Sequence, residues 1–431
     1  MQKYLYAICF CLIAIYVFGF EYLPLQDYPN WLYQGYIFNR LVFHADSFNG
    51  FFHFYHYLAP NSISTVVIGS LTFALPIFLS GKIFLFLTAI VLYYGIVSYL
   101  SFFIKKNEIV ISALALYSVF NLHFLMGFLN FCFSLGLSLL LMSFLLKKKL
   151  SVNIFVLSAI LLIIYLSHFI GLALIVLFML VYCFHYKKYS ESLKILPAFL
   201  PIMILFIHYL VTKNISNLLP SPITNSFRVL AESKLLSTFS VIIPFNKYKW
   251  LSEPSLLLIG ADLFFCIFIT VAACYSLYEA WNKNKWNINV FLGLLLLPLI
   301  VGAPAYFGGM LNPGTRLVLF LELNIFILFL NHNYIIFPRK VILFVVIAFT
   351  LGAYSYNIHN AYQFDKQLQG GVIPLDAILR SRSLFEGTDG YLHLSFYHGI
   401  THHEALRPFR TGMLDYPPDE TGVSSGNKPY K

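Results

Sequence analysis

The chain has 431 residues, of which 59% are hydrophobic and only 11% are charged, and its mean hydropathy is +0.76. Soluble globular domains carry about 25% charged residues, so this composition excludes that class together with disordered and collagen-like chains. The net charge of +10 comes mainly from short lysine pairs between apolar runs, which argues against a nucleic-acid-binding surface. The sequence therefore predicts an all-α fold, a polytopic transmembrane helical bundle.

Apolar segments long enough to cross a bilayer recur along the chain, since a transmembrane helix needs roughly 20 apolar residues. The first segment starts near Lys3 and has no small-residue cleavage site after Phe20, so we expect a retained anchor helix. The eleven predicted spans are about 3–20, 82–104, 108–122, 128–146, 152–167, 169–185, 192–211, 255–280, 288–304, 315–332 and 341–357.

One further apolar run, about 62–80, is ambiguous because it contains Gly69, Pro76 and Gly81. If this run is re-entrant or interfacial, all the lysine-rich connections lie in the cytoplasm, as the positive-inside rule requires, whereas a full crossing would move them all outside. We therefore predict about eleven spans plus a re-entrant or interfacial segment. The basic connections are near 105–106, 147–149, 187–188, 283–285 and 339–340.

This topology divides the chain into a transmembrane domain, 1–357, and a small extracytoplasmic C-terminal region, 358–431, whose Pro-, Gly- and Ser-rich end we expect to be disordered. The long polar loops 21–61 and 212–254 then share the outer face with that region. We therefore expect the chemistry of the protein to take place outside the membrane. The Ile-, Phe-, Lys- and Asn-rich composition is typical of an AT-rich genome, which suggests the inner membrane of a bacterium.

The first outer loop places a carboxylate close to the membrane surface. Asp27 follows the first span by a few residues and directly precedes a helical run, 29–41, that begins with a proline. An acid held there suits a general base or a metal ligand that acts on a lipid-linked substrate. It equally suits a helix N-cap, so spacing alone leaves both interpretations open.

The chain resembles a known enzyme family in its architecture and in these polar stretches. An anchor helix, an Asp before the Pro29–Asn30 pair and a long alternation of spans resemble the C-type (GT-C) integral-membrane glycosyltransferases, with poorly characterised bacterial members the nearest. Three further stretches fit, Asn121–Asn130, Tyr165–His168 and Asn312–Arg316. The resemblance implies transfer of a sugar from a polyprenyl-phosphate donor to a cell-envelope lipid or glycan. It also implies that Asp27 is the acidic residue of the first loop that is essential for this transfer.

The chain departs from the family in its acidic residues. Many members carry paired acids in the first loop, where this chain has Gln26–Asp27, and some carry carboxylates in the second outer loop, where this chain has Asn121, His123 and Asn130. The resemblance therefore implies no certain cofactor and leaves a divalent metal open. His398 and His402 in the C-terminal region are spaced for one helical face but lack an HExxH arrangement.

Six polar residues at the predicted outer ends are candidates for substrate binding. Asn30 belongs to the Pro-Asn pair, and His123 and Asn130 flank a turn where they suit either sugar hydroxyls or helix capping. His168 suits a proton shuttle or an ordinary interfacial histidine. Arg316 suits the donor phosphate or snorkelling to the headgroups. The sixth candidate is Arg228, in the basic and aromatic loop 212–254, which equally suits an amphipathic connector.

Two other functions are alternatives. A polymerase or ligase of lipid-linked glycans would depend on Arg228 more than on Asp27. A transporter or flippase would use acids inside the spans, for which Asp262 and Glu322 are the candidates. Transporters usually show internal repeats and midplane polar sites, whereas here no repeat is visible and the polar residues collect at one face. This pattern favours surface chemistry.

Overall fold

The computed structural model confirms the helical class. Its regular secondary structure is helical apart from two short antiparallel pairs in the part of the chain that it describes. The pairs are β1 (His53–Phe54) with β4 (Leu414–Asp415) and β2 (Tyr306–Phe307) with β3 (Met310–Leu311). The described residues are 2–25, 27–44, 52–54, 58–104, 108–147, 153–212, 288–303, 306–307, 310–311, 313–331, 339–369 and 414–415, with scattered residues between 264 and 282.

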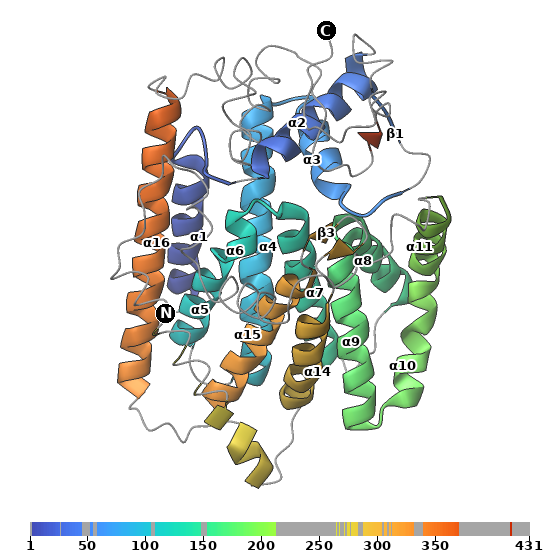
Figure 1. Ribbon diagram of the computed structural model, residues 1–431, viewed down its shortest axis with the longest axis vertical. Helices are drawn as coiled ribbons and strands as arrows, with labels where there is room; N and C mark the ends of the chain where they lie inside the picture. The colour runs from blue at the N-terminus through green and yellow to red at the C-terminus, as the bar shows by residue number, and fades with distance from the viewer. Residues whose placement is uncertain are drawn as a thin grey trace.

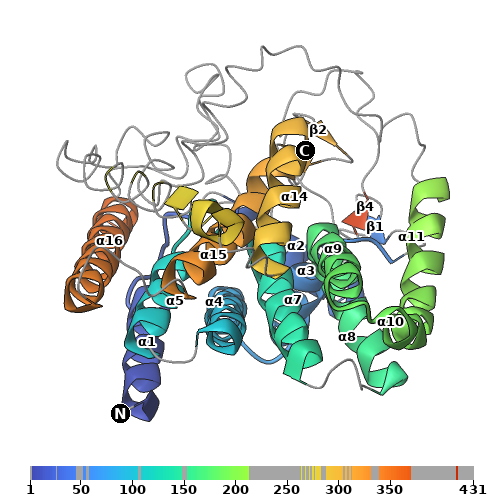
Figure 2. The same ribbon diagram turned by 90° about the horizontal axis from the view of Figure 1, so that it is seen from below.

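The helices stand side by side in a bundle (Figure 1) and coincide with the predicted apolar segments, except that segment 255–280 lies mostly outside the described residues. Seen along the bundle, α16 and α11 lie at opposite edges, with α4, α7 and α9 between them (Figure 2). The helices are α1 (Gln2–Phe18), α4 (Ile77–Phe103), α5 (Glu108–Val119), α7 (Leu129–Lys147), α8 (Ile154–Ser167), α9 (Phe169–Tyr186), α10 (Tyr189–Ile195), α11 (Leu200–Thr212), α14 (Ile288–Gly302), α15 (Pro313–Asn331) and α16 (Arg339–Gln369).

Five helical stretches are long and apolar enough to cross a membrane, which indicates a membrane protein. Their compositions are apolar around the whole helix, as expected where one side of a helix faces lipid and the other faces protein. The stretches are Ile77–Phe103, Glu108–Leu125, Leu129–Lys147, Phe169–Tyr186 and Ser192–Thr212.

The ambiguous run 62–80 divides between two helices. α3 (Ile63–Leu71) has nine residues and is therefore roughly 14 Å long, less than half of the apolar thickness of a bilayer. Pro76 then occupies the N-cap of α4, which starts at Ile77 and not near residue 82 as predicted. Proline has no backbone N–H to donate, so it is well suited to precede the first turn of a helix.

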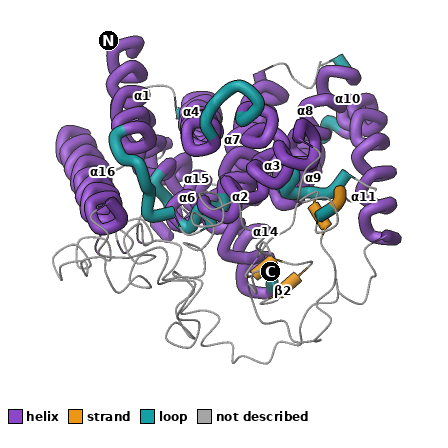
Figure 3. Tube along the Cα trace, turned by 90° about the horizontal axis from the view of Figure 1, so that it is seen from above, coloured by secondary structure: helices purple, strands orange, loops and turns teal. Residues whose placement is uncertain are grey.

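α2 (Tyr28–Asn39), its π-helical continuation Arg40–His44 and α3 lie across one end of the bundle, which we call the α2 end (Figures 1 and 3). The predicted helix near 29–41 is therefore present. α2 packs closely on α3, because the Thr65 hydroxyl donates to Gln34 Oε1 over 3.1 Å. A methyl group on Gly35 would lie 2.6 Å from Ile68 Cγ2. This contact holds the start of α2 over the bundle.

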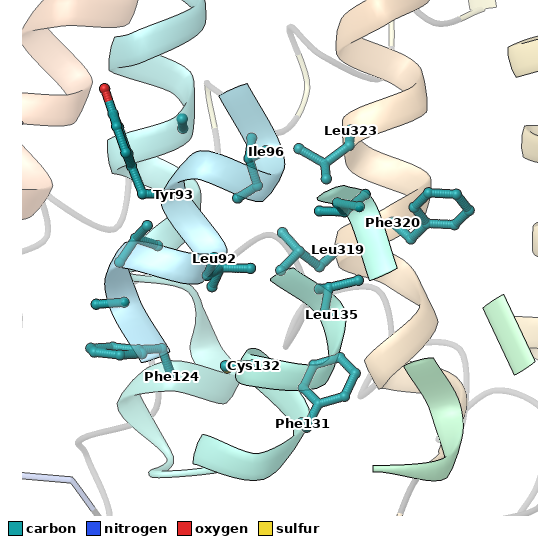
Figure 4. Packing of buried hydrophobic residues seen from close by; sticks show 14 of the residues in the cluster. Leu92, Tyr93, Ile96, Phe124, Phe131, Cys132, Leu135, Leu319, Phe320 and Leu323 are labelled. Carbon is teal, nitrogen blue, oxygen red and sulfur yellow. The ribbon is translucent and has the colours of Figure 1, made fainter. Parts of the chain in front are cut away.

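The core is built around α4, α7 and α15 (Figure 4). Leu92 and Ile96 of α4 and Leu135 of α7 lie near Leu319 and Leu323 of α15. All five side chains are at most 3% exposed. This close packing fixes the N-terminal ends of α7 and α15, which carry the candidate site.

The closest approach between α4 and α7 requires two glycines. A Cβ on Gly136 would lie 2.7 Å from the backbone nitrogen of Leu92, and a Cβ on Gly95 would lie 2.4 Å from the Gly136 carbonyl oxygen. We expect Gly136→Ala to cost about 1–3 kcal/mol, the usual range for overpacking, and to lower the thermal midpoint of the purified protein. Gly352→Ala is the control, because nothing lies within 4 Å of its added methyl group. Equal midpoints for the two variants would contradict the proposed close contact.

Candidate functional site

The turn between α6 (Leu122–Leu125) and α7 supports the start of α2. The backbone N–H of Asp27 donates to the Met126 carbonyl over 3.0 Å, and Trp31 Nε1 donates to the Gly127 carbonyl over 2.9 Å. Gly127 has a φ of +74°, and a Cβ there would lie 2.7 Å from the backbone nitrogen of Tyr28. Only glycine adopts this positive φ easily and also leaves room for the backbone of Tyr28, so the sequence of this turn positions Asp27.

Asp27 occupies the N-cap position of α2, but its side chain makes no capping hydrogen bond. The residue is nevertheless 2% exposed. An N-cap aspartate normally stabilises its helix by accepting a bond from a free backbone N–H. The capping interpretation therefore does not account for a carboxylate buried at this position.

Asn30 lies one turn further along α2 and is fully buried, with no hydrogen-bond partner for either amide atom. The buried Tyr28 hydroxyl also lacks a partner, and it lies where a side chain on Gly81 of α4 would be. Burial raises the pKa of Tyr28 far above its usual value near 10, so the hydroxyl stays protonated. The first turn of α2 thus presents polar groups whose burial is unfavourable in the absence of a ligand.

Arg316, on the first turn of α15, is buried among aromatic rings. Its exposed fraction is 2%, which excludes the predicted alternative of a side chain that snorkels to the headgroups. The guanidinium carbon lies 4.9 Å from the Phe128 ring centroid and 5.9 Å from that of Phe131. His123 and His168 also contact these rings, and we call these five residues the Arg316 cluster. Stacking on aromatic rings is a common way of holding a desolvated guanidinium.

His168 joins α8 to α9 and accepts a hydrogen bond from Arg316. Arg316 Nη1 lies 2.7 Å from His168 Nε2, while the Ile170 N–H lies 3.2 Å from Nδ1. A neutral imidazole has one acceptor nitrogen, so both bonds cannot exist in the same tautomer. We assign Nε2 as the acceptor, because a guanidinium can only donate and its contact is the shorter one. Arg316 is therefore held by a neutral partner.

His123 lies on α6 and belongs to the same cluster, where its ring stacks on Phe128 and meets Phe131 edge-on. Its Nε2 lies 3.0 Å from the Thr315 carbonyl, which can only accept, so this nitrogen carries a proton. Nδ1 is buried and has no hydrogen-bond partner. In the neutral ring this nitrogen is an acceptor that a ligand hydroxyl could satisfy.

Asn130 is used by the fold and does not join the cluster, contrary to the expectation that it binds substrate. Its Oδ1 accepts from the Ser64 N–H over 3.0 Å, and its Nδ2 donates to the Ser64 hydroxyl and to the Asn61 carbonyl. These bonds tie the start of α7 to the start of α3. The amide thus has no atom left without a partner, and its role is structural.

The structure brings Asp27 and the Arg316 cluster, with His123 and His168, into contact with the α6–α7 turn or the first residues after it. Sequence analysis missed the aromatic pair that holds the guanidinium, Phe128 directly before α7 and Phe131 in its first turn, although a spacing of three residues places such rings on one side of a helical turn. Within the described ranges, no three His, Cys, Asp or Glu side chains form a group that could bind a metal. Predicted residues outside the described part of the chain are Arg228, Asp262, His398 and His402.

The α6–α7 turn and the residue that follows it contact both the residue of a buried carboxylate and a buried guanidinium. Asp27 contacts the backbone of Gly127, and the next residue, Phe128, contacts Arg316. Such an arrangement can accept a proton at the carboxylate and stabilise an anion at the guanidinium. Comparison of the chain with protein-family models, curated proteins and solved structures finds no match to any of them.

Proposed function

We propose that the protein is an integral-membrane glycosyltransferase of the GT-C type. It transfers a sugar from a polyprenyl-phosphate donor to a cell-envelope acceptor on the outer face of the membrane. The observation that most supports this proposal is the buried Arg316, held by His168 and two aromatic rings, and connected to Asp27 through the α6–α7 turn that contacts both. A leaving phosphate needs fixed positive charge, and an acceptor hydroxyl needs a base.

The helix directions support an outward-facing α2 end. α4, α7 and α9 all begin near this end, because their first residues contact the first loop, the α6–α7 turn or His168. These three helices therefore end at the opposite end of the bundle, and in the sequence they are followed by the lysines near 105–106, 147–149 and 187–188. By the positive-inside rule, this order supports a topology with the α2 end outside the cytoplasm and about eleven crossings in all.

The surface of the bundle supports contact with lipid. α10 and α11 expose a row of large apolar side chains that a soluble protein would bury. A polyprenyl chain dissolved in the bilayer can reach the α2 end from the side without crossing water. The exposed large apolar residues of these helices and of the turn between them are Tyr189, Leu193, Leu196, Leu200, Met203, Ile204, Ile207 and Val211.

Transfer forms a bond between the acceptor oxygen and the anomeric carbon and breaks the bond from that carbon to the phosphate oxygen. Asp27 takes the proton of the acceptor hydroxyl, and the electron pair of the broken bond leaves with the polyprenyl phosphate. Arg316 stabilises the negative charge of that phosphate. The unpartnered amide of Asn30 binds a hydroxyl of the substrate near Asp27.

His168 keeps Arg316 in place before the donor binds. When the guanidinium turns to the phosphate, Nε2 of His168 loses its donor, and the other tautomer becomes favourable. In that tautomer Nδ1 accepts from the Ile170 N–H, which is already 3.2 Å away, and Nε2–H becomes a second donor for the phosphate. The neutral histidine therefore costs little to displace, whereas a carboxylate partner would compete with the donor.

The first test is mass spectrometry of envelope glycolipids and glycoproteins from a deletion strain and from the same strain complemented with the wild-type gene. We expect one sugar to disappear on deletion and to return on complementation, and its mass identifies the transferred residue. Unchanged glycans in the deletion strain would contradict the proposal. The polymerase alternative depends on Arg228 and the transporter alternative on Asp262 and Glu322. Glu322 of α15 is buried, and Arg228 and Asp262 lie outside the described residues.

Replacing Gly127 tests whether the turn positions Asp27. A left-handed conformation costs a non-glycine residue about 1–2 kcal/mol, and the added methyl group would also meet the backbone nitrogens of Asp27 and Tyr28 at 2.8 and 2.7 Å. We expect Gly127→Ala to lower both the thermal midpoint and the transfer rate. The control is Gly293→Ala, whose methyl group meets a neighbouring side chain at an ordinary 3.8 Å. Wild-type transfer by the Gly127 variant would show that the turn does not position the acid.

A further inference from the structure

α16 carries two buried asparagines whose side chains have no hydrogen-bond partner. Asn357 and Asn360 are each 1% exposed, and all four of their amide nitrogen and oxygen atoms are unpaired. The Tyr356 hydroxyl lies beside the Asn360 amide, but it too is buried without a bond of good geometry. The outer half of this helix thus offers five unpaired polar atoms in five consecutive residues.

Three other buried asparagines have hydrogen-bond partners for their amides, whereas Asn30 of the candidate site and Asn289 Oδ1 do not. Asn121 Oδ1 accepts from two backbone N–H groups and its Nδ2 donates to the Ser118 carbonyl. Asn130 makes three hydrogen bonds, and Asn324 donates to Phe320 and accepts from Tyr99. An unpaired buried amide is destabilising, and such groups call for an explanation in a native structure. A ligand that supplies the missing partners is that explanation for α16.

Two contacts place the asparagines at the level of the candidate site. One turn before Asn357, the Tyr354 ring packs 5.7 Å from Phe120, which in turn contacts Phe124 of α6. Beyond Asn360, Asp365 Oδ1 accepts a 2.8 Å hydrogen bond from the backbone N–H of Tyr22. The first loop runs from Tyr22 to its contact with α6 and contains Asp27, and Figure 1 shows the upper part of α16 beside α1 and this loop.

We infer that Asn357 and Asn360 bind the hydroxyl groups of an uncharged carbohydrate, the sugar portion of a substrate. A carboxamide both donates and accepts, as a hydroxyl does, so two neighbouring amides can bind vicinal hydroxyls in either sense. A charged sugar would instead require a counter-charge beside the amides. The charged side chains that the structure records at this end, Asp365, Glu21 and Lys82, interact with one another or with Gln369 at the end of the helix. The inference rests on the proposed function for the identity of the ligand as a carbohydrate.

The test compares thermal unfolding of the full chain, purified in a detergent without a sugar headgroup, for Asn357→Leu, Asn360→Leu and the double variant. Removing an unpaired amide from a buried position should raise the midpoint without ligand by about 1–3 °C. The matched control is Asn130→Leu, which loses three hydrogen bonds and should lower the midpoint. A fall for the α16 variants like that of the control would show that the amides are structural and would overturn the inference.

The second measurement adds glucose, galactose or mannose at high millimolar concentration, with glucuronate as the charged counterpart. We expect at least one neutral sugar to raise the thermal midpoint of the wild type, and glucuronate to raise it less. The double variant should lose this shift, and its transfer rate should fall at least about tenfold. No shift in the wild type, or an equal shift in the double variant, would overturn the inference.

The outcomes separate this inference from the proposed function. If Asp27→Asn abolishes transfer while the double variant keeps both transfer and the sugar-dependent shift, the function stands and the α16 site fails. If the double variant loses the shift while Asp27→Asn transfers normally, the carbohydrate site stands and the catalytic proposal fails.

Discussion

Asp27→Asn should reduce glycosyl transfer by at least ~10²-fold and leave the protein folded, because an amide cannot take the proton of the acceptor hydroxyl. The variant preserves the shape of the side chain, and the backbone bond from residue 27 to Met126 does not depend on the carboxylate. The measurement is the initial rate of sugar transfer by the purified protein from a polyprenyl-phosphate sugar, together with glycan mass spectrometry of the complemented deletion strain.

The control for this prediction is Asp365→Asn. Asp365 lies at the same end of the bundle, and its Oδ1 accepts a bond from the backbone N–H of Tyr22 that an asparagine oxygen can also accept. We expect this variant to transfer at close to the wild-type rate. Full activity in Asp27→Asn would remove the base from the mechanism and would favour a structural role for the first-loop acid.

The second large effect is expected for Arg316→Leu, which removes the positive charge that we propose stabilises the leaving phosphate. Removal of one group that stabilises developing negative charge typically costs about 10²–10³-fold in rate. Arg316→Lys should be intermediate, since lysine keeps the charge but loses the forked donors and the stacking on Phe128. Transfer rates and thermal midpoints of both variants give the comparison.

The control for the arginine is Arg40→Leu. The Arg40 guanidinium lies 5.3 Å from the Tyr36 ring, at the opposite end of α2 from Asp27, so it shares the aromatic contact without belonging to the Arg316 cluster. We expect its transfer rate to stay near that of the wild type. Equal losses of transfer rate in Arg40→Leu and Arg316→Leu would indicate a general effect of removing basic residues. A wild-type transfer rate in Arg316→Leu would contradict the proposed role of Arg316.

The sequence predicted where the helices lie, since the apolar runs, the proline in the first turn of α2 and the proline before α4 mark their positions. The boundaries were less accurate, and α16 continues twelve residues beyond the predicted end at 357. The extension keeps a buried face, with Ala361, Phe364 and Leu368 at most 7% exposed. A hydropathy criterion misses this extension, because exposed polar residues alternate with the buried ones once a helix leaves the apolar region.

The candidate residues were predicted as polar groups near helix ends, but the sequence did not distinguish their roles. Asn130 and His123 flank the same turn, yet the first completes its hydrogen bonds within the fold and the second contacts the Arg316 cluster. The difference depends on Ser64, a residue of α3 that lies 66 positions away. Partners this distant in sequence do not follow from local spacing.

By itself the sequence determined the helical class, the positions of most helices and the concentration of polar residues at one end, because hydrophobicity and backbone chemistry act locally. Only the tertiary structure decided that Arg316 is buried against rings of α7 and bonded to His168, 148 positions earlier, instead of extending to the headgroups. Whether a side chain at a helix end turns inward depends on which neighbouring helix offers a partner. Helix–helix packing, which the glycines at 95, 127 and 136 permit, sets that choice.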